Sequence, residues 1–237
     1  MAYIKTPEGK FHYNSVFLYL GRKTIDKAKA LDNLRLLVGI LDRKSLRYGP
    51  LFGTLLGIIR SDDFIDWDED IDLYLLKEDE EAFLSMLPLL KTEGFDLVRY
   101  DKRGLYSLMR DGEYIDFYVL RKVSPELRHT GGADFIFERY LEDVTEYDFK
   151  GISLRVPKDV EQYLEFTYGD WRTPVQYFNY SPSSFEMFRM RFREWFKRCI
   201  PDSIYPLMIR IYRKKDLRKF LAKCAKKGIE LHYPIHL

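Results

Sequence analysis

The chain has 237 residues, of which 46% are hydrophobic and 32% charged, so we expect a folded globular protein with one domain, or one domain and an appendage. Its two cysteines and four histidines show neither a CxxC pair nor the spacing of zinc ligands, which argues against a disulfide framework and a zinc site. No apolar run reaches about 18 residues and the N-terminus lacks a leader pattern, so we expect no membrane-spanning helix and no signal peptide, and a cytoplasmic location by default.

The first 175 residues alternate between helical and strand-like patterns. Residues 1–23 are aromatic-rich and carry only a weak signal, whereas residues 25–46 show apolar residues at helical spacing after a candidate cap, Thr24. Three more helices are expected, at 54–60, at 78–93 and at 158–168, and the second of them should bend at Pro88 and end at Gly94. Strands are expected at 48–52, 71–76, 95–100, 105–110, 114–120 and 151–157. An Asp111-Gly112 hairpin turn should join the strands at 105–110 and 114–120. This pattern predicts an α+β fold, with a small mixed sheet flanked by helices.

The C-terminal region differs from the rest of the chain in charge. Residues 181–237 carry 14 Lys and Arg against 5 Asp and Glu, a net charge of +9, whereas residues 1–180 carry 25 against 32, a net charge of −7. We therefore divide the chain into a domain at 1–175 and a basic, aromatic-rich helical appendage at 176–237. The basic amphipathic segments within 185–228 suit peripheral contact with an anionic membrane surface, although apolar residues at this spacing more often pack into a core.

Three aspartates at alternate positions form the most informative motif of the chain. If Asp68, Asp70 and Asp72 lie on an extended strand, their side chains point the same way, because strand side chains alternate with a period of two. Carboxylates held that close repel one another unless a cation lies between them. A hard divalent ion, Mg²⁺ or Mn²⁺, is the simplest such cation, because it prefers oxygen ligands and is usually held by a few carboxylates together with substrate phosphates.

Two further features suit the same chemistry. Gly53 would let a phosphate approach the backbone, a helix that starts at Thr54 would direct free N–H groups at it, and Arg60 could neutralise a second phosphate oxygen. Asp116 lies in an alternating strand, and it could complete the metal site and accept the proton of an attacking hydroxyl. An Asp-x-Asp pair alone is a weak signal, but this combination is far more specific.

In these segments the sequence resembles the LicD/fukutin-related family. Members share a Gly-Thr-Leu-Leu-Gly-x-x-Arg segment, which stands here at 53–60, and a Trp-Asp-Asp-Asp-x-Asp type motif, which stands here as Trp-Asp-Glu-Asp-Ile-Asp at 67–72. The preceding Ile-Asp replaces the usual Ile-Pro and changes no expected ligand. A later strand aspartate matches Asp116, and Val-Pro, Tyr-Leu and Tyr-Gly-Asp elements of the family recur within 156–170. The resemblance covers about 48–174, just over half the chain.

The resemblance implies a nucleotidyltransferase-like fold, with the motif-bearing core at 48–174 of a catalytic domain at 1–175. It also implies a LicD-type phosphotransferase that moves phosphocholine or an alditol phosphate from a CDP-linked donor to a sugar hydroxyl of a cell-surface glycan. The basic tail, rather than the resemblance, suggests a lipid-linked glycan acceptor and a place at the inner membrane surface. In such an enzyme Asp70 and Asp72 would be metal ligands, Asp116 a ligand and possible base, and Gly53 and Thr54 a phosphate cradle. Asp68 would be a weaker or indirect ligand.

Two alternatives stay open at this point. The same fold could move a nucleotide from an NTP to a small acceptor or to RNA held by the basic tail, although nucleic acid is not the expected partner. The chain could also be a non-catalytic membrane- or glycan-binding module, but such a module has no need of three converging carboxylates.

Overall fold

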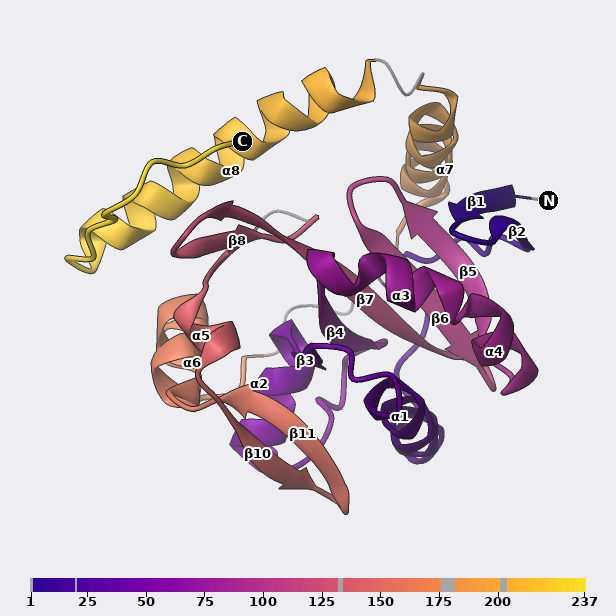
Figure 1. The fold of residues 1–237 in the computed structure, drawn as a ribbon, viewed down its shortest axis with the longest axis horizontal. Helices are drawn as coiled ribbons and strands as arrows, with labels where there is room; N and C mark the ends of the chain where they lie inside the picture. Colours follow the sequence, from indigo (N-terminus) through magenta and orange to yellow (C-terminus); the bar gives the residue numbers. More distant parts are fainter. Residues whose placement is uncertain (1, 20, 132–133, 176–181, 201–203) are drawn as a thin grey trace.

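The computed structural model describes residues 2–19, 21–131, 134–175, 182–200 and 204–237 (Figure 1). Its centre is a mixed sheet in the order β3-β4-β7-β6-β5, and β8 and β9 extend it from β7. Strands β4 and β7 are parallel, and the other pairs of this sheet are antiparallel. The strands are β3 (Tyr48–Pro50), β4 (Ile71–Leu76), β5 (Asp96–Asp101), β6 (Leu105–Arg110), β7 (Glu113–Ser124), β8 (Leu127–His129) and β9 (Phe135–Phe137). The predicted α+β fold with a small mixed sheet is confirmed.

Both faces of the central strands are covered, which gives the sheet two hydrophobic cores. Every residue of β4 is buried, and alternate residues of the strand enter different cores, Leu73 and Leu75 the first and Tyr74 and Leu76 the second. Strand β7 repeats the pattern, because Phe117 lies in the first core and Leu120 in the second. A polar residue on either strand therefore lies on a defined face of the sheet.

The helices lie on either side of this sheet. They are α1 (Lys27–Asp42), α2 (Phe52–Ser61), α3 (Glu80–Ser85), α4 (Leu87–Thr92), α5 (Arg139–Glu142), α6 (Val160–Tyr168), α7 (Ser184–Cys199) and α8 (Tyr205–Lys226), with a 3₁₀ turn, η1, at Lys77–Asp79. The cap of α1 is Asp26 rather than the predicted Thr24, since the Asp26 side chain accepts the N–H of Lys29. The single bent helix expected at 78–93 is instead η1, α3 and α4, because Pro88 fits the first turn of a new helix better than a helix interior.

Two hairpins lie outside the central sheet. Strands β1 (Ala2–Thr6) and β2 (Gly9–Tyr13) pair with each other over residues that the sequence pattern left irregular, so that expectation is wrong. Strand β11 (Ile152–Pro157) was predicted, but its partner β10 (Val144–Phe149) was not, because exposed and half-buried residues dominate β10. The Asp111-Gly112 turn joins β6 to β7 as predicted, and both of its residues have positive φ angles, 53° and 83°.

The two C-terminal helices have different environments. Helix α8 runs past the β8–β9 end of the sheet (Figure 1), and its Phe220 ring packs on Phe135, Phe137 and Phe166 with centroid distances of 5.3, 5.4 and 5.8 Å. Helix α7 instead exposes five aromatic side chains: Phe185, Phe188, Phe192, Trp195 and Phe196. The expected boundary between 175 and 176 adjoins residues 176–181, which lie outside the described part of the chain. The division into a domain and an appendage stays a prediction.

Candidate active site

A row of polar residues crosses four strands of the central sheet in register. Arg99 of β5 pairs with Ser107 of β6, Ser107 with Asp116 of β7, and Asp116 with Asp72 of β4. A β-bulge between Leu97 and Arg99 sets the register of the first pair. Because paired residues on neighbouring strands project on the same face, two aspartates far apart in the sequence become direct neighbours. The parallel pairing of β4 and β7 therefore builds the site.

Asp70, Asp72 and Asp116 converge at this point. Each offers a carboxylate oxygen within 4.8 Å of the others, and Asp72 and Asp116 are only 8% and 1% exposed. Burial and mutual repulsion raise the pKa of Asp70 and Asp72 well above the usual range, and burial raises that of Asp116 as well. Three ionised carboxylates in so little space need a counter-charge, and a divalent cation with oxygen ligands supplies one.

Arg99 supplies part of that counter-charge, and no pattern in the sequence predicted this role. Its Nη2 forms an ion pair with Asp116 Oδ2, and its Nε donates to Ser107 Oγ at 2.7 Å. The second carboxylate oxygen, Asp116 Oδ1, is buried and has no hydrogen-bond partner among the residues that the structure describes. Such an orphaned acceptor is costly unless a ligand satisfies it, so the donor set fits a bound cation.

The start of α2 holds the aspartates in place from the other side. Thr54 Oγ1 accepts the backbone N–H of Asp72 at 2.8 Å, and Asp72 C=O accepts the N–H of Leu51 at 2.9 Å. The Thr54 hydroxyl is thus engaged with the protein itself. Helix α2 begins at Phe52 rather than at Thr54, with no side-chain cap, so the first-turn N–H groups have no partner within the helix and point outward.

Asp68 occupies a different place from the other two motif aspartates. Strand β4 starts only at Ile71, so of the three motif aspartates only Asp72 lies on the strand, and the expected alternation along a strand is wrong for Asp68. Asp70 directly precedes the strand and still converges with Asp72. The Asp68 carboxylate lies against Gly53, where a Cβ would collide with its Oδ2, and burial raises its pKa to about 6. Position 53 therefore has to be a glycine because the Asp68 carboxylate lies so close to it, in addition to any role in phosphate binding.

Two other features of α2 bear on the site. Phe52 has a φ of 46°, a conformation that costs a bulky residue on the order of 1–3 kcal/mol and that clusters at functional sites. Arg60 lies in the last turn of the helix, about 10 Å along the axis from Gly53 at a rise of 1.5 Å per residue. The structure thus brings Gly53 and Thr54 to the aspartates, whereas Arg60 is at the far end of the helix.

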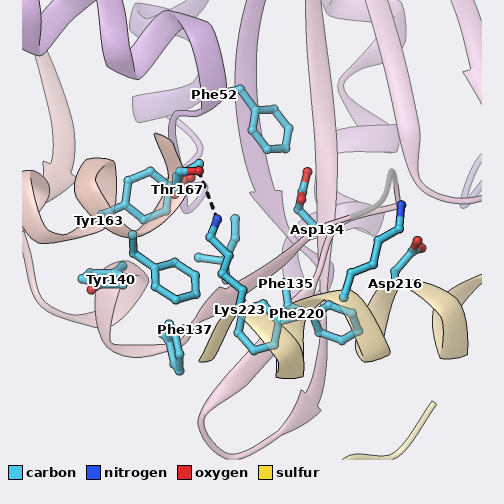
Figure 2. A pocket seen from close by; sticks show the side chains of 13 residues that line it. Phe52, Asp134, Phe135, Phe137, Tyr140, Tyr163, Thr167, Asp216, Phe220 and Lys223 are labelled. Atoms are coloured by element: carbon cyan, nitrogen blue, oxygen red, sulfur yellow. Dashed lines mark hydrogen bonds between the residues drawn. The ribbon is translucent and has the colours of Figure 1, made fainter. Parts of the chain in front are cut away.

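A cavity of about 180 Å³ lies between α2, α6, β9 and α8 (Figure 2). Phe52 connects this cavity to the aspartates, because it lines the cavity and its ring contacts Tyr118 edge-on at 5.0 Å, while the side chain of Tyr118 lies beside Asp72. Most of the wall is aromatic, and Lys219 and Lys223 of α8 also line it. Lys223 donates to the C=O of Thr167 at 3.0 Å (Figure 2), and its Nζ lies 4.6 Å from the centre of the Phe166 ring.

Within the described part of the chain, every helix is too short or too polar to span a membrane.

The chain is similar to several known proteins. Residues 45–159 match the family described as LicD/FKTN/FKRP, nucleotidyltransferase domain. An uncharacterised protein of Rickettsia typhi is 28% identical over 173 residues, which are 70% of this chain and 54% of that protein. Ribitol 5-phosphate transferase FKRP of Mus musculus is 28% identical over 174 residues, which are 65% of this chain and 34% of that protein. The chain therefore spans about half of the one relative and a third of the other.

The solved structures add a distant likeness only. The lincosamide antibiotic adenylyltransferase LnuA, in a lincomycin-bound crystal structure, is 10% identical, with a TM-score of 0.41 over 68% of this chain and 93% of that one. The family match, by contrast, includes β4, β7 and all three converging aspartates. Over residues 45–159, therefore, the chain is similar to the nucleotidyltransferase domain of the LicD/fukutin-related family.

Proposed function

We propose that the protein is a metal-dependent transferase that moves an alditol phosphate from a CDP-linked donor to a sugar hydroxyl of a glycan. The observation that carries the proposal is the convergence of Asp70, Asp72 and Asp116 within 4.8 Å, with the buried oxygen Asp116 Oδ1 left without a partner. The family match supports a transferase, and the FKRP relative is named a ribitol 5-phosphate transferase.

The three carboxylates would hold Mg²⁺ or Mn²⁺, and Asp68, behind Gly53, would act on the site indirectly. When bound, the ion supplies positive charge that offsets the charge of the donor phosphates. The outward-pointing N–H groups in the first turn of α2, at Gly53 and Thr54, would bind the same phosphates, because a helix N-terminus favours anions. The Thr54 hydroxyl keeps the Asp72 backbone in position for this.

We assign the proton transfer to Asp116. The acceptor hydroxyl oxygen forms the new bond to phosphorus, the bond between that phosphorus and the CMP oxygen breaks, and CMP leaves. The hydroxyl proton passes to a carboxylate oxygen of Asp116 and from there to solvent. Arg99 holds the other oxygen of Asp116 through its ion pair, which fixes the carboxylate in one orientation.

The cavity in Figure 2 favours an alditol over choline as the transferred group. A quaternary ammonium ion binds well among aromatic rings, but here the Lys223 ammonium group already lies over the Phe166 ring. Lys219 and Lys223 also balance the charge of Asp134 and Asp216 in the same wall, so the cavity offers no net negative charge to a cation. With about 180 Å³, the cavity is smaller than the roughly 300–1,000 Å³ of sites for drug-sized ligands. It would hold one uncharged, hydrogen-bonding part of the donor.

The family match and the basic tail support a proposal for the acceptor and the cellular location. We propose a glycan or lipid-linked glycan acceptor at the inner membrane surface, with α7 as the point of peripheral contact. The exposed aromatic side chains of α7, together with its exposed Arg189, Arg191 and Arg193, support this, since such surfaces bind anionic lipid interfaces. The rest of the expected contact segment, in α8, packs partly against the domain instead.

Product analysis tests the proposal. The protein is incubated with Mg²⁺, a panel of short glycans and CDP-ribitol, CDP-glycerol, CDP-choline or an NTP, and the products are identified by mass spectrometry. We expect an acceptor that gains an alditol phosphate, with release of CMP and no reaction in EDTA. A product that carries a nucleoside would assign nucleotidyl transfer instead, and undiminished transfer in EDTA would remove the metal from the mechanism.

A further inference from the structure

A group of basic side chains lies where β7 and β8 meet α8. We call Arg121, His129 and Arg213 the arginine cluster. Arg121 and His129 are directly paired residues of β7 and β8, so their side chains lie next to each other on one face. His129 Nε2 lies 3.9 Å from Asp216 Oδ2 on α8, and Arg213 stands one helical turn before Asp216 on the same side of that helix.

The cluster contains four buried nitrogen atoms without a hydrogen-bond partner in the described part of the chain. They are Nε of Arg121, Nε of Arg213 and both ring nitrogens of His129. The imidazole is 3% exposed and packs against the Phe135 ring at a centroid distance of 4.6 Å. A buried donor left unsatisfied costs on the order of 1–3 kcal/mol, so several together point to a missing acceptor.

The neighbouring charged side chains do not act as acceptors for these buried nitrogen atoms. Arg103, whose backbone adjoins Gly131, is paired with Asp101, and Lys77, which faces Arg121, is paired with Glu80. Asp216 is the carboxylate nearest to the imidazole, and at 3.9 Å it is too far for a hydrogen bond. Burial and the neighbouring guanidinium groups of Arg213, Arg121 and Arg103 lower the pKa of His129 to about 4. The imidazole is therefore neutral and has one N–H to donate.

We propose that the arginine cluster binds a phosphate group. Two guanidinium groups offer planar pairs of donors that match phosphate oxygens, and the imidazole adds a third donor. Arg121 and Arg213 are only half-buried, so an anion reaches them from solvent.

The cluster lies away from the aspartate centre along β7. Arg121 follows Asp116 by five positions, about 16 Å at 3.3 Å per residue, and strand alternation places the two residues on opposite faces of β7. Two neighbours of His129, Phe135 and Asp216, also line the cavity in Figure 2. The ligand is free phosphate or a phosphomonoester on a larger molecule, which share this chemistry.

Thermal unfolding tests the site without any assay of turnover. The full chain is melted in EDTA at constant ionic strength with chloride, inorganic phosphate or glycerol 3-phosphate. EDTA keeps the aspartate centre free of metal, where three carboxylates repel an anion. A ligand at a hundred times its dissociation constant stabilises the native state by about 2.7 kcal/mol, so we expect a rise in melting temperature with phosphate over chloride. Equal rises with both probes would indicate free phosphate, and a larger rise with the ester would indicate a phosphorylated partner.

Variants locate the binding. Arg213→Met and Arg121→Met should abolish the phosphate-dependent rise, Arg213→Lys should keep part of it, and Arg210→Met, exposed on the same helix one turn earlier, should leave it unchanged. Line broadening of the ³¹P signal of phosphate on titration with protein gives a second readout that does not depend on stability. An equal rise and equal broadening in Arg213→Met, Arg121→Met and the native chain would overturn the proposal, and so would the absence of both effects in the native chain. Neither result would contradict the proposed transfer reaction.

Discussion

Strand β7 contributes to two polar clusters, one acidic and one basic, and they are compensated differently. Asp116 meets Asp70 and Asp72 on one face, where Arg99 offsets one of the three acids and Thr54 fixes the backbone of another. Arg121 meets His129 and Arg213 on the other, where no described residue bonds their buried nitrogens. A buried charge is costly without a compensating charge or hydrogen bond. The difference teaches that the acidic group has compensating partners within the protein, whereas the buried nitrogens of the basic group have none among the described residues.

The largest expected effect separates function from stability at the acidic group. Asp70→Asn removes a ligand that has no arginine partner, so transfer should fall at least about a hundredfold, because even the outer partners of metal ligands cost 10–100-fold when mutated. In EDTA the same variant should melt at a higher temperature, since one source of repulsion is gone. Asp148→Asn, at an exposed aspartate of β10, is the control that should change neither. Unchanged turnover in Asp70→Asn would contradict the assignment.

The basic group should make stability depend on pH. The folded-state pKa of His129 is lowered to about 4, below the roughly 6.5 of an unfolded chain, so the unfolded state binds the proton first. Stability should therefore be full above about pH 6.5 and fall as pH drops towards 4, by at most about 3 kcal/mol.

Urea unfolding of the native chain and of His129→Gln over this range isolates the histidine contribution as the difference between the two curves. Bound phosphate should make stability less dependent on pH, because the anion favours the protonated imidazole of His129. Parallel curves for the two proteins would exclude His129 as the titrating group.

Arg99 is the residue that makes the acidic group unlike the basic one. Arg99→Met should lower turnover by about 10–100-fold, the usual cost of losing a partner that orients a metal ligand. Arg99→Lys keeps the charge but cannot hold Asp116 and Ser107 together, so it should restore only part of the activity. Steady-state kinetics of both variants measure this, and full activity in Arg99→Met would mean that Asp116 needs no orientation.

The smallest effect concerns the backbone beneath the acidic group. Thr54→Val removes the acceptor of the Asp72 N–H and leaves a buried donor unsatisfied, which should cost about 1–3 kcal/mol in urea unfolding. Thr54→Ser keeps the hydroxyl and is the matched control. Equal stability of the two variants would show that another group replaces the hydroxyl.

Local patterns allowed much of the fold to be predicted. The bounds expected for β4 and β6 are those observed, because apolar runs and the Asp111-Gly112 turn define them within a short stretch of sequence. The β1–β2 hairpin and the short strands β8 and β9 were missed, because they are stabilised by pairing and packing rather than by a strong periodicity of their own.

The part of the site that could be predicted is the part whose residues stand close together in the sequence or in a recognisable strand. Asp70 and Asp72 stand together in the sequence, and Asp116 sits in a recognisable alternating strand. Arg99 reaches Asp116 across an intervening strand, through a register that a β-bulge sets. Arg213 meets Arg121 only because α8 folds back onto β8 and β9. Such non-local registers and dockings leave no trace in the spacing of residues along the chain.

A titration of Mn²⁺ followed by electron paramagnetic resonance tests most directly whether the three carboxylates form a metal site. We predict saturable binding to the native chain, which competes with Mg²⁺ and is lost in both Asp70→Asn and Asp72→Asn, while Asp148→Asn binds as the native chain does. Binding that persists unchanged in the two site variants, or no binding to the native chain at all, would contradict a metal site at Asp70, Asp72 and Asp116.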